Sequence, residues 1–159
     1  MDVLTLGIAS LWSGLFSASL GIVFTAPPRH AFSTFLCGFA GRLARDVLVG
    51  CGLPESWSTL VAAAVVVLVG VAAIRGHVVS PVVLVSGVLP LGAALAVFHA
   101  IVALLRISTL EGEALDAASV SLAANVGKAF TTSLAIALGL WAGIAVVRLS
   151  RRKPAPVGA

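Results

Sequence analysis

The stretch Gly38-Phe39-Ala40-Gly41-Arg42-Leu43-Ala44-Arg45-Asp46 places three formally charged side chains inside a long apolar segment. On a helix, at about 100° per residue, its glycines, arginines and aspartate fall within a sector of roughly 140°. An ionisable side chain at membrane depth costs several kcal/mol, so it normally faces a helix bundle, a partner or a water-filled path. This segment is therefore the first candidate for a functional site.

The composition of the whole chain predicts an integral membrane protein. Of its 159 residues, 60% are hydrophobic and 10% are charged, and the mean hydropathy is +1.14. A soluble domain carries about 25% charged residues. The sequence shows no catalytic triad, no phosphate-binding loop and no Cys/His cluster with metal-ligand spacing. We therefore expect neither an enzyme nor a bound metal or cofactor.

Five apolar stretches are long enough to be membrane helices, because about 20 apolar residues cross a bilayer. We expect an all-α protein with one membrane domain over residues 1–153 and a disordered tail over 154–159. Pro81 and Pro90 interrupt the fourth stretch, and a kink or break is expected near Pro90 because proline removes a backbone hydrogen bond. The expected helices are residues 3–24, 31–49, 56–74, 78–105 and 117–147.

The distribution of charge between the turns predicts the orientation. With five crossings, one side receives six basic and no acidic residues, and the other receives one basic and five acidic residues. Short cytoplasmic loops collect Lys and Arg, which places the N-terminus outside and the C-terminus in the cytoplasm. The net charge of +4 then reflects topology, and no nucleic-acid partner is expected. Four crossings, with residues 31–49 as a re-entrant hairpin, are the alternative.

Within the charged segment, Arg42 and Asp46 are four residues apart and are expected to pair. Arg45 would then stay free to bind a carboxylate through two hydrogen bonds. Gly38 and Gly41 lie on the same face and complete a candidate substrate site. The alternative is structural: both arginines bind a carboxylate or backbone carbonyls of another helix, or extend toward lipid headgroups.

Other polar positions are expected either to complete such a site or to stabilise helix packing. Pro90 and Gly92 suggest a broken helix of the kind that exposes backbone groups to a substrate, although prolines are also ordinary kinks. His99 is expected either to hydrogen-bond between helices or to relay protons. Asn125 and Lys128 belong to a polar patch in the last helix, where Lys128 is expected to extend toward the outer headgroups.

A series of short motifs follows one another in a particular order along the chain. They are Ala26-Pro27-Pro28-Arg29, Gly38-x-x-Gly41-x-x-x-Arg45, Gly52-Leu53, Trp57-Ser58-Thr59, Pro90, Arg106-Ile107, Asn125 and the basic tail. From about Val23 to Lys153, this order resembles the threonine/serine exporter family. The resemblance is to the short membrane subunit of its two-chain members, which include proteins linked to succinate export. The chain departs from that pattern at Ala93-Ala94, in place of Pro-Gly, and at Phe98, in place of tyrosine.

The resemblance implies a subunit of a secondary transporter in the bacterial inner membrane. It would export small polar metabolites, either threonine and serine or a dicarboxylate such as succinate, with efflux driven by the proton gradient. It also implies a larger partner subunit with a cytosolic segment and about five helices, which would form an inverted repeat with this chain. The alternatives are a non-transporting scaffold or assembly subunit, and a channel. The candidate substrate-binding residues are Gly38, Gly41, Arg42, Arg45, Asp46, Pro90, Gly92 and Asn125.

Overall fold

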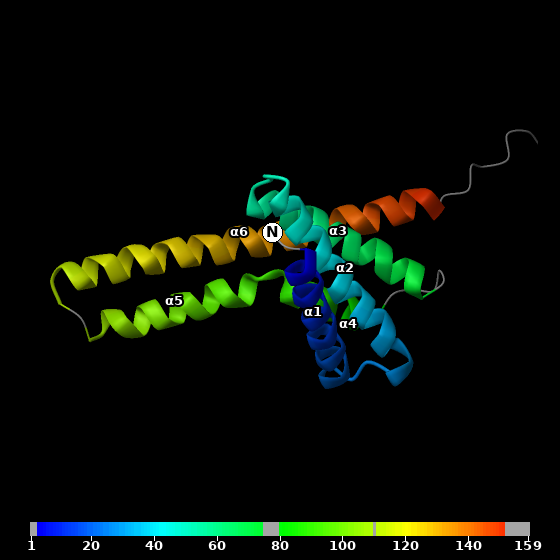
Figure 1. The fold of residues 1–159 in the computed structure, drawn as a ribbon, viewed down its shortest axis with the longest axis horizontal. Helices are drawn as coiled ribbons and strands as arrows, with labels where there is room; N and C mark the ends of the chain where they lie inside the picture. Colours follow the sequence, from blue (N-terminus) through cyan, green and yellow to red (C-terminus); the bar gives the residue numbers. More distant parts are fainter. Residues whose placement is uncertain (1–2, 75–79, 110, 152–159) are drawn as a thin grey trace, which may run out of the picture.

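The computed structural model in Figure 1 describes residues 3–74, 80–109 and 111–151. Every regular element within these ranges is helical, as the sequence predicted. The tail expected to be disordered, residues 154–159, lies outside the described residues, as do residues 78–79 of the expected fourth helix. The elements are α1 (Val3–Val23), η1 (Pro28–His30), α2 (Ala31–Gly50), α3 (Glu55–Ala73), α4 (Pro81–Val88), η2 (Leu89–Leu91), α5 (Ala93–Ile107) and α6 (Glu113–Arg151).

Helices α1 to α4 pack together as a bundle, and the second half of α6 lies against α3 (Figure 1). Helix α5 runs beside the first part of α6, and these two segments project from the bundle as what we call the α5–α6 hairpin. At 1.5 Å per residue, the 39 residues of α6 extend over about 58 Å, nearly twice the ~30 Å hydrocarbon core of a bilayer. The last helix thus extends beyond both ends of the expected range, residues 117–147. One part of it packs in the bundle and the other part forms an arm of the hairpin.

Three helices among the described residues are long and apolar enough to cross a membrane. Helix α4 together with η2 forms one arm, α5 forms a second arm, and the chain bends by 57° between them. The two arms would be a fourth crossing if they make one broken span. Helix α2 is less apolar than these helices because it carries Arg42, Arg45 and Asp46. The three spans are Leu4–Val23, Glu55–Ala73 and Glu113–Ser150.

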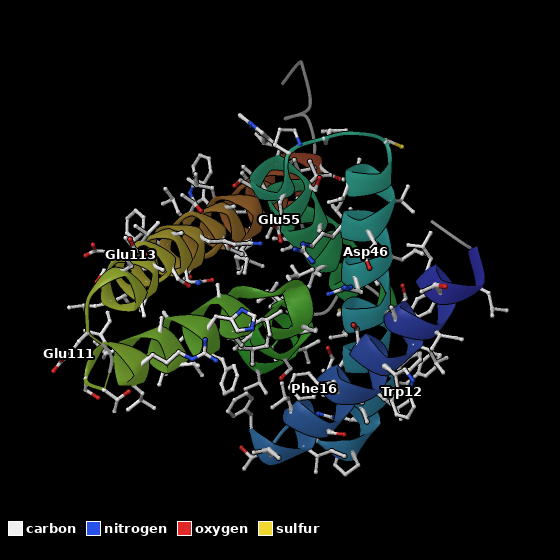
Figure 2. All side chains as sticks on the ribbon, turned by 60° about the vertical axis from the view of Figure 1, so that its left-hand side comes forward. Trp12, Phe16, Asp46, Glu55, Glu111 and Glu113 are labelled. Carbon is white, nitrogen blue, oxygen red and sulfur yellow. The ribbon has the colours of Figure 1, made fainter. Side chains whose placement is uncertain are left out.

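The distribution of side chains between the interior and the surface suits a lipid environment. Large apolar side chains are exposed, among them Trp12 and Phe16 of α1, which are labelled in Figure 2. Small and hydroxyl-bearing side chains are buried instead, among them Ser10, Thr34 and Thr59. In water such an exterior would favour aggregation, whereas lipid tails accommodate it and small residues let membrane helices approach closely. The chain therefore fits a membrane protein, as its composition predicted.

The break predicted near Pro90 is confirmed. Helix α4 ends at Val88, a single 3-10 turn follows over Leu89–Leu91, and Gly92 adopts φ +107° and ψ 0°. This left-handed conformation favours glycine, which has no Cβ to collide with the backbone. The chain thereby leaves the bundle along α4 and enters the hairpin along α5 (Figure 1).

Candidate functional site

A cavity of about 210 Å³ lies beside this break, where α2, α3, α5 and α6 meet. Its volume equals that of roughly seven water molecules at ~30 Å³ each, which suits a small metabolite. We call it the charged cavity because most of its polar lining is ionisable. Its lining residues are Arg42, Arg45, Glu55, Gly92, Leu95, Ala96, His99, Asn125 and Lys128.

Arg42 and Asp46 form the ion pair that their spacing predicted. The Arg42 Nε donates a hydrogen bond to the Asp46 Oδ2 over 2.7 Å. Asp46 is buried, and a buried carboxylate needs a close cation because it has lost its hydration. This pair within α2 therefore gives Arg42, which lines the cavity, a carboxylate partner just outside the cavity lining.

The expectation that Arg45 is free is wrong. Its Nη2 forms a short ion pair with the Glu55 Oε1, its Nε donates a hydrogen bond to the Thr59 Oγ1 over 3.2 Å, and its Nη1 lies 3.8 Å from the Asp46 Oδ1. Only 10% of the side chain is exposed. The structural alternative, an arginine bound to a carboxylate of another helix, describes Arg45 correctly.

Glu55 bridges two cations from different helices. Its Oε1 pairs with Arg45 of α2, and its Oε2 lies 2.7 Å from the Nζ of Lys128 in α6. Figure 2 shows Asp46 and Glu55 on the neighbouring helices α2 and α3. Lys128, which was expected to extend toward the outer headgroups, is 54% exposed, and its ammonium group pairs with this carboxylate.

The ion cluster, which we define as Arg42, Arg45, Asp46, Glu55 and Lys128, has three positive and two negative charges. Its formal charge is thus +1. A net positive cavity next to low-dielectric walls attracts anions, because the field is screened less there than in bulk water. The chemistry available to this site is therefore the binding of a small anion.

The remaining predicted site residues have different surroundings. A Cβ at Gly92 would lie 3.5 Å from the Arg45 Nη2. At the break, the backbone of this glycine therefore lies next to the guanidinium group with no side chain between them. A Cβ at Gly38 would overlap the Ser17 side chain of α1, and one at Gly41 would lie 2.6 Å from the Val66 Cγ2 of α3. The structure thus brings Arg42, Arg45, Gly92 and Asn125 to one cavity and Asp46 to its ion cluster, while Gly38 and Gly41 pack against helices and Pro90 lies in the adjoining turn.

Sequence reasoning missed Glu55 and did not assign Lys128 or His99 to the site. The third helix was expected to begin at residue 56, which left Glu55 in the turn before it, but α3 begins at Glu55. Because a short turn separates α2 from α3, the first turn of α3 lies beside the last turns of α2. An acidic residue ten positions after an arginine, across a tight helical turn, was the available signal.

A second cavity, of about 560 Å³, lies between α5 and α6 in the hairpin. It shares His99 and Asn125 with the charged cavity, so the two spaces adjoin at these residues. Arg106 also lines it, together with several alanines. Glu111 and Glu113 lie beyond it, at the tip of the hairpin (Figure 2).

We also searched for side chains that could bind a metal ion and compared the chain with other proteins. Within the described residues, no group of three or more His, Cys, Asp or Glu side chains could hold a metal ion. Comparison of the chain with protein-family models, curated proteins and solved structures found no match. The charged cavity is therefore the observation on which a function can be proposed.

Proposed function

We propose that this chain is the short subunit of a two-chain secondary transporter that exports small carboxylates across the bacterial inner membrane. The substrates would be threonine and serine or a dicarboxylate such as succinate. One observation carries the proposal: a net positive cavity lies beside a broken helix within a bundle of apolar helices. Ionisable groups at membrane depth mark substrate and proton pathways, and discontinuous helices recur at transporter binding sites.

The lining of the charged cavity suits a molecule with two polar ends. A carboxylate would bind to Arg45 and Lys128 at the bundle side of the cavity. His99 and Asn125 line the hairpin side, where they could hydrogen-bond the second polar group of an amino acid or a dicarboxylate. The adjoining cavity in the hairpin would then provide a route to or from this position.

The proposal includes five crossings, with the N-terminus outside and the C-terminus in the cytoplasm. The basic residues of the turns and tail support this orientation, and the packing of α2 between α1 and α3 supports counting α2 as a crossing. The turn between α2 and α3 would face outward, so the ion cluster would lie toward the outer side.

The proposal also includes a larger partner subunit with a cytosolic segment and about five helices. The hairpin supports this part because α5 exposes Phe98, Ile101 and Leu104 away from α6 and the bundle. A second membrane subunit of inverted topology could cover such a face. The two halves would then enclose a site between them, as in other inverted-repeat transporters.

A second candidate function is a non-transporting scaffold. The Glu55 bridge favours it, because each cation of the ion cluster already has a carboxylate partner within the chain. In that case the cluster would only hold α2, α3 and α6 together.

An efflux experiment separates these functions. Cells expressing the chain, with and without the partner subunit, are preloaded with threonine, serine or succinate. Saturable export that is lost in Arg45→Gln and kept in Arg29→Gln supports the transporter, because Arg29 is an exposed arginine away from the cavity. Unsaturable flux would indicate a channel. Correct insertion without export would favour the scaffold.

A further inference from the structure

A third cavity, of about 300 Å³, forms a groove between α3 and α6 beside the ion cluster. Ser56, Trp57 and Thr131 line the end of the groove that is nearest the ion cluster. Ser56 directly follows Glu55, and Thr131 lies about one helical turn after Lys128. The rest of the lining is apolar and consists of Leu60, Leu134, Ala135 and Leu138. The groove therefore has one polar end and an apolar body, which is the pattern of an amphiphilic ligand.

The position of the groove along α3 places it within one leaflet of the membrane. Helix α3 has 19 residues and is about 28 Å long, close to the ~30 Å hydrocarbon core, so Glu55 lies at one surface of that core. Trp57 is exposed in the first turn of α3, where an indole ring suits the membrane interface. From Thr131 to Leu138 the groove follows α6 for about 10 Å, whereas one leaflet of the core is ~15 Å deep. This length suits part of one acyl chain.

The apolar end of the groove is closed by the packing of the two helices. A Cβ at Gly139 would overlap the Leu60 carbonyl oxygen, and one at Gly143 would lie 2.8 Å from the Val67 Cβ. The backbones of α3 and α6 are thus nearly in contact beyond Leu60, and the groove ends there. A helix of a partner subunit packs along a longer face because it crosses both leaflets. The groove therefore fits a lipid chain better than a helix.

The polar end of the groove combines positive charge with hydrogen-bond donors. The Lys128 ammonium group carries three donors and pairs with Glu55 through one contact. The exposed Ser56 hydroxyl and Trp57 indole N–H are further donors at this end. The ion cluster next to them has a formal charge of +1. A phosphate group at this position would gain charge-assisted hydrogen bonds and attraction to the cluster.

We propose that this groove binds one anionic phospholipid. The lipid phosphate contacts Lys128 and Ser56 at the membrane surface. One acyl chain lies along Leu60, Leu134 and Leu138, and the second chain stays in the bilayer. This lipid site goes beyond the proposed function, because it requires neither a transported solute nor a partner subunit.

Native mass spectrometry of the full-length chain, released from detergent and titrated with phosphatidylglycerol or phosphatidylcholine, tests the phosphate site. We expect the first phosphatidylglycerol to bind at least about fivefold more tightly than phosphatidylcholine, which is the preference that one lysine near the membrane surface gives for an anionic lipid. Lys128→Gln should abolish this preference. Arg148→Gln is the matched control, because it removes an exposed cation near the other end of α6, and it should keep the preference.

A second pair of variants tests the acyl-chain site. Leu134→Trp fills the groove and should reduce the binding of phosphatidylglycerol to the level of phosphatidylcholine, because the chain no longer fits beside the phosphate site. Leu104→Trp adds the same ring on α5, outside the groove, and should leave lipid binding unchanged. Leu134 and Leu104 are similarly exposed, at 50% and 56%, so both variants should fold.

The same spectra contain the outcomes that would overturn the lipid site. Equal binding of the two lipids by the native chain, or a preference that persists in Lys128→Gln or in Leu134→Trp, would show only a non-specific lipid layer. A dimer that Leu134→Trp dissociates would assign the groove to a second copy of the chain. Displacement of the lipid by glycerol phosphate, which has the headgroup without the chains, would show a site for free phosphates instead.

Discussion

The Glu55 carboxylate and the Lys128 ammonium lie 2.7 Å apart and join the first turn of α3 to the middle of α6. Both side chains are partly exposed, at 40% and 54%. An ion pair of this kind contributes only about 0–1 kcal/mol to stability. Its position at the base of the α5–α6 hairpin therefore points to a role in binding rather than in holding the fold.

Replacing Lys128 tests this distinction. Lys128→Gln should reduce export of the transported solute at least tenfold, because one of the two cations proposed to bind the substrate carboxylate is lost. The free energy of unfolding should change by less than about 1 kcal/mol. Lys128→Arg retains the charge and serves as the matched control. Loss of folding in Lys128→Gln would instead identify the pair as structural.

Replacing Arg45 should affect both stability and export. Arg45→Gln leaves Glu55 and Thr59 without their buried partner, which we expect to cost about 2 kcal/mol in the free energy of unfolding. The double variant Arg45→Gln/Glu55→Gln should recover part of this stability, because the Glu55 carboxylate, which keeps only Lys128 as a partner in the single variant, is gone, but it should still fail to export. Full export by the double variant would show that the role of Arg45 is structural only.

Substitution of Gly41 tests whether this residue serves helix packing or substrate binding. Its Cβ would lie 2.6 Å from the Val66 Cγ2, so Gly41→Ala should overpack the α2–α3 contact and cost about 1–3 kcal/mol. Adding Val66→Ala should restore much of the loss, as thermal unfolding in detergent would show. The KM for export should stay unchanged in the double variant, since the cavity is lined by other residues. A raised KM would place Gly41 in the substrate site.

Gly92 is predicted to resist substitution because of its backbone. At φ +107°, Gly92→Ala should destabilise the protein by about 1–2 kcal/mol. The added Cβ would make only an ordinary contact, at 3.5 Å from the Arg45 Nη2, so crowding contributes little. Gly127→Ala is the control: its Cβ would meet no neighbour within 4 Å, and alanine should stabilise this helical position by about 0.5–1 kcal/mol. Equal changes in the free energy of unfolding for Gly92→Ala and Gly127→Ala would contradict the explanation by backbone conformation.

The two native cysteines report the orientation without engineering. Cys51 is exposed in the turn between α2 and α3, whereas Cys37 is fully buried against α3. A membrane-impermeant maleimide should label intact cells at Cys51, and Cys51→Ser should abolish the labelling. Modification only after the membrane is permeabilised would place this turn in the cytoplasm and reverse the proposed topology.

The parts of the structure that the sequence predicted well are local. The first three apolar stretches defined α1, α2 and α3 because each is close to the length that a bilayer requires. The break followed from Pro90 and Gly92 lying two residues apart. The pairing of Arg42 with Asp46 followed from their spacing of one helical turn. In each case, neighbouring residues in the chain carry the interaction.

The parts that were missed depend on how helices rotate against one another. Lys128 meets Glu55 because α6 packs closely on α3, where a Cβ at Gly143 would lie 2.8 Å from the Val67 Cβ. The contact between α2 and α3 brings Arg45 to Glu55. A single sequence specifies which faces are small or polar, but it does not specify which faces meet.

Because α5 begins at the bend at Gly92, a small rotation there produces a large displacement at the other end of the helix. A rotation of about 10° at this point would carry the far end of the 15-residue helix through roughly 4 Å. The pivot lies beside the Arg45 guanidinium, so rearrangement of a single ion pair acts at the short end of a lever. Its long end forms one wall of the cavity in the hairpin, where the same movement would widen or narrow the passage by more than the diameter of a water molecule.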